Sequence, residues 1–140
     1  MRYRDAALGI VFVLAITSVA VAAVDRRADT LANGESVLAG VEMTASMPIA
    51  DLIADPDAFD GKLVQVEGVI VAMCSGMGCW ASVDDGEGNQ MNIKVEDGVI
   101  DWREITATER YMVAEGVFQK VGEHGMQVFI MEHGAVVSTD

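Results

Sequence analysis

The sequence predicts an all-β domain, a small five-stranded barrel that follows a short helix and an N-terminal signal or anchor segment. Three observations support this class. The 140-residue chain opens with a long apolar run, and it later alternates apolar and polar residues in five separate stretches. The connections between those stretches are too short to contain the helices of a parallel α/β fold.

The apolar run extends from Ala6 to Val24 without a charged residue, and Arg2 and Arg4 precede it. Nineteen helical residues would span about 28 Å, close to the thickness of the hydrocarbon layer of a membrane. We therefore expect residues 1–24 to be an export signal, either cleaved or retained as a membrane anchor. The remainder would then be periplasmic or anchored to the outer face of the inner membrane, with membrane contact only through this segment.

Residues 25–46 show no sustained period, which predicts a linker between the apolar run and the domain. The domain itself would occupy residues 47–140. A short helix is expected over Ile49–Phe59, because apolar residues recur on one helical face there and Asp60-Gly61 provides a stop signal.

Five strands are expected in the rest of the chain, where β-branched residues alternate with polar ones. Their predicted ranges are Leu63–Met73, Trp80–Val83, Met91–Val95, Tyr111–Gln119 and Gln127–Val137. Gly68 and Gly116 lie in the middle of the first and fourth strands, so each marks a bulge or a sharp bend. Five strands, two of them bent, with an insertion between the third and fourth, describe an OB-fold-like barrel.

The charge of the chain restricts its partners. Nine Lys and Arg face 22 Asp and Glu, a formal net charge of −13. Nucleic acid and anionic lipid require basic residues that displace counterions, so this charge argues against both. An unknown protein or a small ligand is the expected partner. The sequence shows no triad, phosphate-binding loop or paired carboxylates, so no catalytic residue and no enzymatic activity are predicted.

Both cysteines of the chain, Cys74 and Cys79, flank four residues between the first two predicted strands. The flanking positions of such a hairpin loop are expected to face each other within disulfide range. An oxidising compartment would favour the bond, whose small ring contributes about 2 kcal/mol of stability. The neighbours of the two cysteines would complete a binding rim, namely Gly76, Met77, Gly78 and Trp80.

Three roles for this loop stay open: a structural disulfide, an exchangeable redox pair, or a soft-metal site. Two thiolates with a thioether suit Cu(I), and further ligands could approach from the last hairpin. The expected ligand set for copper is Cys74, Met77, Cys79, His124 and Met126. Core packing is the alternative for the methionines, and packing inside the barrel is the alternative for Trp80.

Four short motifs form one pattern: Gly61-Lys62, Val64 through Val69, Cys74, and Gly78-Cys79-Trp80. The pattern resembles that of small exported OB-fold proteins in a bacterial domain-of-unknown-function family, whose Cys-x4-Cys loop ends in Gly-Cys-Trp. The resemblance covers about Ile49 to Phe118 and implies a fold and an extracytoplasmic location, without an activity. The sequence thus favours an exported, non-catalytic binding or accessory module whose Cys74–Cys79 loop is the functional rim. Soft-metal or thiol-redox handling is the alternative.

Overall fold

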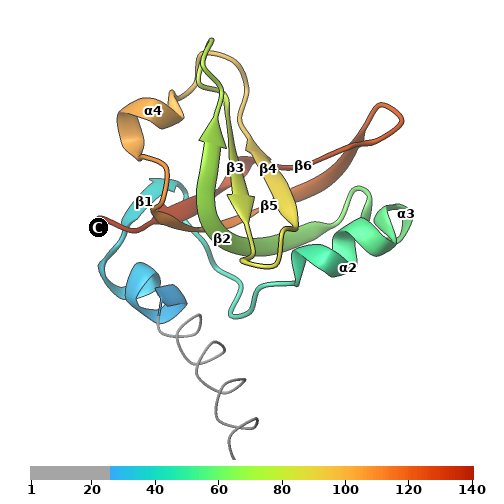
Figure 1. Cartoon of the computed structure of the whole chain (residues 1–140), viewed down its shortest axis with the longest axis horizontal. Helices are drawn as coiled ribbons and strands as arrows, with labels where there is room; N and C mark the ends of the chain where they lie inside the picture. The colour runs from blue at the N-terminus through green and yellow to red at the C-terminus, as the bar shows by residue number, and fades with distance from the viewer. Residues whose placement is uncertain (1–25) are drawn as a thin grey trace, which may run out of the picture.

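The computed structural model describes residues 26–140 (Figure 1). The predicted signal or anchor segment, residues 1–24, lies outside that range. Among residues 26–140, no helix combines the length and the apolar character that crossing a membrane requires. The export of the chain therefore stays a prediction.

Six strands and several short helices form the described part of the chain. The strands are β1 (Glu35–Leu38), β2 (Leu63–Met73), β3 (Trp80–Asp84), β4 (Gln90–Lys94), β5 (Tyr111–Val121) and β6 (Gly125–Val137). The helices are α2 (Ile49–Ala54), α3 (Pro56–Phe59) and α4 (Trp102–Ile105), and residues 26–33 are also helical. All five predicted strands are present, whereas β1 was not predicted.

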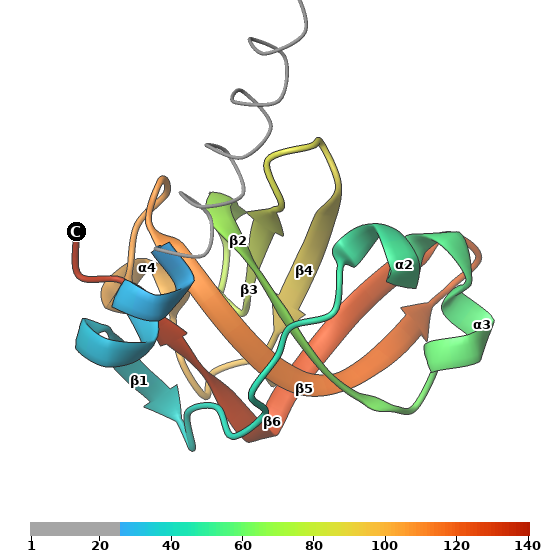
Figure 2. The ribbon, with the colours of Figure 1, turned by 90° about the horizontal axis from the view of Figure 1, so that it is seen from below.

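Five of the strands close into a ring. Their order is β6-β4-β3-β2-β5, and β5 pairs back onto β6. The β4–β6 pair is parallel and the other pairs of the ring are antiparallel. The ring is the OB-fold-like barrel that the sequence predicted (Figures 1 and 2).

The two long strands serve both halves of the barrel wall. β2 pairs with β5 up to Val69 and with β3 from Val69 onward, so the strand turns at Gly68 as predicted. A Cβ on Gly68 would lie 2.3 Å from the carbonyl oxygen of Asp84. This close approach of backbones leaves no room for a side chain at position 68. The bulge of β2 lies a few residues further on, between Ile70 and Ala72. The register of β5 with β6 also shifts at Gly116, but the additional residues lie in β6, since Glu115 is opposite Gly134 and Val117 is opposite Phe129.

The predicted helix over Ile49–Phe59 is interrupted. α2 ends at Ala54, and α3 begins two residues later at Pro56. Asp55 between them has φ −143° and ψ 70°, because a proline disfavours the helical conformation of the residue before it. The prediction of a helix was right in extent and wrong in continuity.

The sequence predicted a linker over residues 25–46, but the described part of it, residues 26–46, folds against the barrel (Figure 2). β1 pairs antiparallel with residues 134–137 of β6. Further along, the N–H of Met47 donates to the carbonyl oxygen of Gln65 at 2.7 Å. The segment covers Gln65 and Glu115, whose side chains would otherwise lie on the outer surface of β2 and β5 and are 0% and 2% exposed.

A buried polar network holds this cover in place. The carboxylate of Glu115 accepts from the backbone N–H groups of Glu42 and Met43 at 3.1 and 2.8 Å, and from the amide of Gln65 at 3.0 Å. Arg27 donates to Gln65 at 2.6 Å and to Glu67 at 2.8 Å. Buried polar groups are tolerated when they are paired in this way. Long-range polar contacts, rather than an apolar pattern, therefore fix the segment.

The interior of the barrel forms one hydrophobic core. Two short helices contribute to it from outside the ring. α2 buries Ile49 and Leu52, and α4 buries Trp102, which is fully inaccessible to solvent. α4 follows the loop after β4, and its buried tryptophan fixes it beside the Cys74–Cys79 loop.

Candidate functional site

The Cys74–Cys79 loop joins β2 to β3 at one end of the barrel (Figure 1). The N–H of Cys74 donates to the carbonyl oxygen of Trp80 at 3.0 Å, and the carbonyl of Cys79 accepts from Val95 at 3.0 Å. The sequence predicted that the two cysteines face each other directly. In the structure they are offset by one residue, because Cys74 pairs with Trp80. Both are free thiols in the structure, Cys74 partly buried and Cys79 8% exposed. The disulfide between them stays a prediction for the oxidised protein.

Backbone N–H groups of the loop gather around the Cys74 sulfur. Hydrogen bonds from Gly76 and Gly78, with smaller contributions from Met77 and Cys79, lower the pKa of Cys74, although burial opposes this effect. A thiolate accepts such bonds far better than a neutral thiol, so the loop favours the charged form. Because the thiolate is the nucleophile and the metal ligand, Cys74 is prepared for either chemistry.

Arg103 of α4 holds this loop from the side. Its guanidinium donates to the carbonyl oxygens of Ser75 and Gly76 at 2.8 and 3.0 Å. Asp101 accepts from the same guanidinium at 2.6 Å. Asp101 is the main cause that raises the pKa of Arg103, and the charge of the Cys74 sulfur raises it further. Arg103 therefore positions the loop and also provides a positive charge beside the thiolate.

Gly78 anchors the other side of the loop on α4. Its carbonyl accepts from the N–H of Trp102 at 3.0 Å. Its φ is +67°, and a Cβ there would lie 1.9 Å from the carboxylate of Asp101. Both the positive φ and the close approach require glycine at this position. Residues 101–103 thus bond the loop at Ser75, Gly76 and Gly78. These bonds hold the loop without a disulfide, which weakens the case for a purely structural disulfide.

Lys94 of β4 and Asp97 lie beside the sulfur of Cys79. The ammonium of Lys94 pairs with the carboxylate of Asp97 at 2.8 Å. This hydrogen bond is the main cause that raises the pKa of Lys94, and the Cys79 side chain raises it further through a hydrogen bond and its charge. Cys79 thus lies beside a cation and a carboxylate, because the side chain of Asp97 also bonds it.

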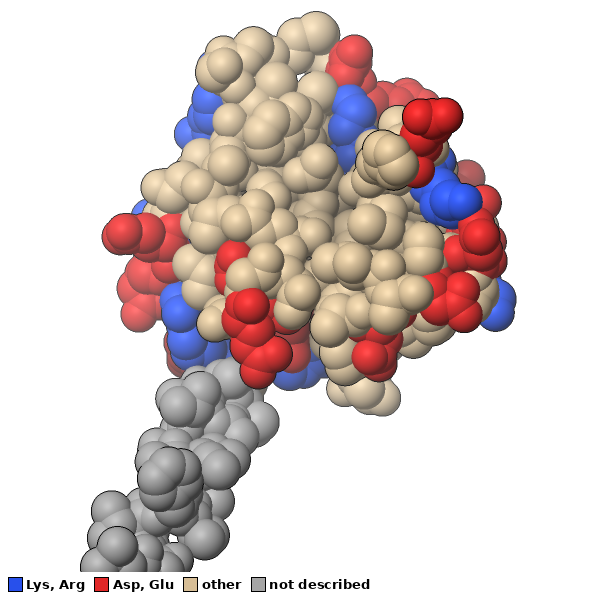
Figure 3. Space-filling view, turned by 45° about the vertical axis from the view of Figure 1, so that its right-hand side comes forward, with Lys and Arg blue, Asp and Glu red and all other residues tan. Residues whose placement is uncertain are grey.

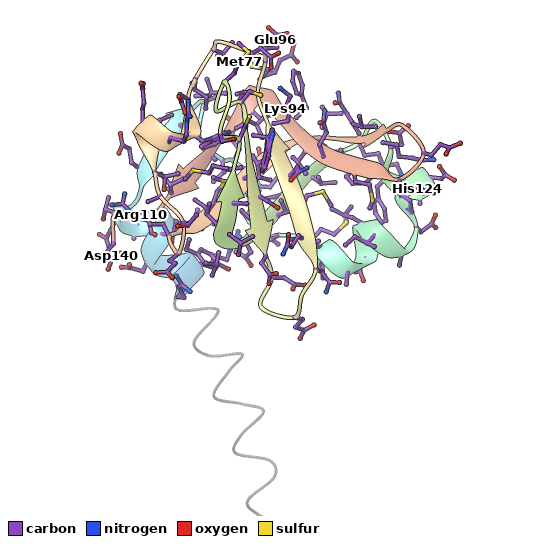
Figure 4. All side chains as sticks on the ribbon, turned by 45° about the horizontal axis from the view of Figure 1, so that its top comes forward. Met77, Lys94, Glu96, Arg110, His124 and Asp140 are labelled. Carbon is purple, nitrogen blue, oxygen red and sulfur yellow. The ribbon has the colours of Figure 1, made fainter. Side chains whose placement is uncertain are left out.

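Two thioethers reach the same end of the barrel. Met77 is at the tip of the loop and is 56% exposed. The sulfur of Met131, on β6, accepts from the N–H of Glu96 at 3.4 Å. Figure 4 shows Met77, Lys94 and Glu96 at this end. Met131 was not in the predicted ligand set, because only the parallel register of β4 and β6 places it beside Glu96.

The remaining two predicted ligands, His124 and Met126, are not brought to the loop. His124 lies in the turn between β5 and β6, on another side of the molecule (Figure 4). The β4–β6 register places Met126 beside Met91, four residues before Val95, the residue bonded to Cys79. Four residues of strand correspond to about 13 Å. The predicted five-residue set is therefore wrong for these two ligands.

Residues 26–140 contain no group of three or more His, Cys, Asp and Glu side chains placed to hold a metal ion. A soft-metal site at the loop would thus consist of thiolates and thioethers. Trp80, the aromatic member of the predicted rim, is half-buried and packs against the core, as the packing alternative anticipated. In the loop, Ser75, Gly76 and Met77 are exposed, Cys74 is half-buried, and Gly78 and Cys79 are buried.

Removal of the Arg103 side chain is expected to shift the reactivity of Cys74 to higher pH. In Arg103→Ala the loop carbonyls lose their donors and the thiolate loses a positive charge, so the pKa of Cys74 should rise toward its ordinary value. The pH profile of Cys74 alkylation by iodoacetamide, followed by peptide mass spectrometry, measures this shift. Arg110→Ala is the matched control, since Arg110 lies away from the loop (Figure 4). Identical profiles for both variants would contradict the assigned role.

No protein-family model matches the chain, and no curated protein matches it in sequence. Among solved structures, the chain is similar to "OBody AM1L10 bound to hen egg-white lysozyme", with 18% identity, a TM-score of 0.48, and coverage of 64% of this chain and 91% of that one. It is also similar to the hypothetical protein ygiW from E. coli, with 17% identity, a TM-score of 0.44, and coverage of 68% and 92%. An asparaginyl-tRNA synthetase from Pyrococcus horikoshii matches at 19% identity and a TM-score of 0.48, over 66% of this chain and 21% of that one.

Likeness at this level of identity concerns the fold alone. The described chain is an OB-fold-like domain, and its strand order is the evidence for that class. The membership in an exported family that the Gly-Cys-Trp loop suggested stays a prediction, while the fold it implied is confirmed.

Proposed function

We propose that this chain is an exported, non-catalytic accessory module that binds a soft cation, Cu(I) foremost, through Cys74 and Cys79. The observation that carries the proposal is the pair of thiols that flank one loop, the partly buried Cys74 beside the backbone N–H groups of the loop and the buried Cys79 beside Lys94. Thiolate ligands select soft cations such as Cu(I). Two thiolates on one Cu(I) leave a net negative charge, which Arg103 and Lys94 would offset.

The thioethers support the same assignment. Met77 and Met131 lie at the end of the barrel that carries the two cysteines, and thioether sulfur is a ligand for Cu(I) rather than for hard cations. The exposed Met77 would meet an incoming ion first. Arg103, on α4, holds the loop through the carbonyls of Ser75 and Gly76, so binding would require little rearrangement.

Thiol–disulfide exchange is the second candidate, favoured by the lowered pKa of the partly buried Cys74. The Cys74 thiolate would attack one sulfur of a disulfide in a partner protein, form a mixed disulfide and release one partner thiolate. The Cys79 thiolate would then attack the Cys74 sulfur and release the second. Two electrons pass to the partner, and the new Cys74–Cys79 bond is the oxidised product.

A competition titration tests the metal proposal. The reduced full-length chain is titrated anaerobically with Cu(I) against a chromogenic Cu(I) chelator. We expect one equivalent to bind, and affinity to fall by more than about 100-fold in Cys74→Ser and in Cys79→Ser, because each variant removes a direct ligand. Met126→Leu is the matched control and should bind as the unaltered chain does.

Equal Cu(I) affinity in the unaltered chain and both serine variants would refute the metal proposal. The exchange candidate is decided by adding oxidised glutathione to the reduced, metal-free chain. Formation of the Cys74–Cys79 disulfide with release of two glutathione thiols, faster than for a free thiol peptide, would support it. Rates no higher than those of the peptide would exclude it.

A further inference from the structure

A cleft of about 290 Å³ lies away from the thiol loop, between β3 and β4 on one side and the β5–β6 hairpin on the other. Its lining residues come from three strands and the hairpin turn: Ser82, Gln90, Asn92, His124, Gly125 and Met126. His124 and Met126 are not brought to the thiol loop, and no role proposed for the cysteines uses the other four residues. The cleft is therefore a separate feature of the barrel.

The cleft lining has no Asp, Glu, Lys or Arg, although the chain has a net charge of −13. The cleft on the other side of the same hairpin, by contrast, includes Lys120 and Glu123. Figure 3 brings forward the right-hand side of Figure 1, where the β5–β6 hairpin lies, and the centre of that view is mostly uncharged while acidic and basic residues lie around its margin. Asp84, opposite Gln90 at the margin of the cleft, already accepts from the Gln90 amide at 3.2 Å.

The strand register extends the neutral surface across four strands. Ser82 on β3 lies opposite Asn92 on β4, Asn92 lies opposite Gln127 on β6, and Gln127 lies opposite Gln119 on β5. Residues opposite one another in a ladder point to the same face. The amide of Gln127 donates to that of Gln119 at 2.8 Å, which fixes its orientation. The result is a row of hydroxyl and amide groups on one face.

An aromatic pair lies in the next row of the same face. Trp80 on β3 lies opposite Lys94, and Lys94 lies opposite Phe129 on β6. Both aromatic side chains are half-buried and so retain accessible surface. The face therefore combines rings with hydroxyl and amide groups, and Lys94, its one cation in this row, is paired with Asp97.

We propose that this face binds a neutral, hydroxyl-rich saccharide. Sugar hydroxyls donate and accept hydrogen bonds, as the amides of Gln90 and Asn92 and the hydroxyl of Ser82 also do. The apolar faces of sugar rings pack on aromatic side chains, which Trp80 and Phe129 supply. A peptide added as an extra strand is disfavoured, because β3 and β4 already have partners on both sides.

Nuclear magnetic resonance of the labelled, full-length chain tests this proposal. The chain is titrated with chitotetraose, which is neutral and carries both hydroxyl and amide groups, and with maltotetraose, which carries hydroxyls alone. We expect saturable shifts of the side-chain amides of Gln90 and Asn92 with at least one sugar. Asn92→Ala should weaken binding about tenfold, since the sugar would lose its hydrogen bond to the exposed Asn92 amide. Asn33→Ala, remote from the cleft, is the matched control.

Absence of shifts at Gln90 and Asn92 with both sugars would overturn the proposal. So would equal affinities of Asn92→Ala and the unaltered chain, or a response to an uncharged Gly-Ser peptide in place of the sugars. Cys74→Ser should retain the sugar response, since the cleft does not depend on the thiol site. A chain that binds sugar but not Cu(I) would refute only the metal proposal. A chain that binds Cu(I) but not sugar would refute only the saccharide proposal.

Discussion

Replacement of Gly116 by alanine is expected to lower the free energy of unfolding of the domain by more than about 4 kcal/mol. The added Cβ would lie 2.2 Å from the carbonyl oxygen of Phe129, 2.7 Å from its carbonyl carbon and 2.9 Å from the Cα of Ile130. All three atoms belong to the backbone of β6, which pairs with β5 on both sides of this position. The strand can yield only by giving up ladder hydrogen bonds, so the strain is not relieved by rotation of a side chain.

Urea unfolding followed by circular dichroism measures this effect. Gly76→Ala is the matched control, because a Cβ at Gly76 meets only the Cys74 sulfur, at an ordinary 3.8 Å. Its change in unfolding free energy should stay within about 1 kcal/mol of the unaltered chain. A Gly116→Ala variant of nearly unaltered stability would show that β5 and β6 do not approach each other as closely as the structure has them.

Truncation of Trp102 to alanine is expected to cost about 3 to 5 kcal/mol of stability. The side chain is fully buried and is the largest contribution of α4 to the core. Its removal leaves a cavity beneath the helix that carries Arg103. The same variant should therefore weaken the hydrogen bonds of Arg103 to the Cys74–Cys79 loop as well as destabilise the barrel.

Trp102→Phe discriminates between packing and hydrogen bonding at this position. The indole N–H of Trp102 is buried without a hydrogen-bond partner, so phenylalanine removes no bond and keeps most of the apolar volume. We expect it to cost less than about 1.5 kcal/mol. Thermal unfolding of both variants provides the comparison. Equal losses in the two would indicate that the N–H does have a partner in the folded protein.

Local signals in the sequence were sufficient for most of the barrel. Alternation of β-branched residues located β2 to β6, and glycine within β2 and β5 located the turning points of the wall. The helix break at Asp55 could also have been predicted, since Pro56 follows it. The apolar residues on both sides of it favoured one continuous helix instead. β1 had no such signal, because only Val37 of its four residues is buried.

The candidate site was harder to predict because its supporting residues are remote in sequence. The loop itself was visible from Cys74 and Cys79, but Arg103 reaches it from 27 and 28 residues away. Lys94 reads in sequence as an ordinary surface cation of a strand. Conversely, the histidine and methionine of the last hairpin looked suitable as ligands, and the register of β4 and β6 places them elsewhere.

The pairing of β1 with the end of β6 determines where the independently folding unit starts. A chain trimmed at residue 47, the boundary that sequence alone suggests, would leave residues 134–137 with an open hydrogen-bonding edge. It would also strip the buried carboxylate of Glu115 of its two backbone donors. Open edges of this kind recruit strands from other molecules. By pairing with residues 134–137, the segment 26–47 covers this edge against strands of other molecules. A shorter fragment that is to stay monomeric should therefore include it.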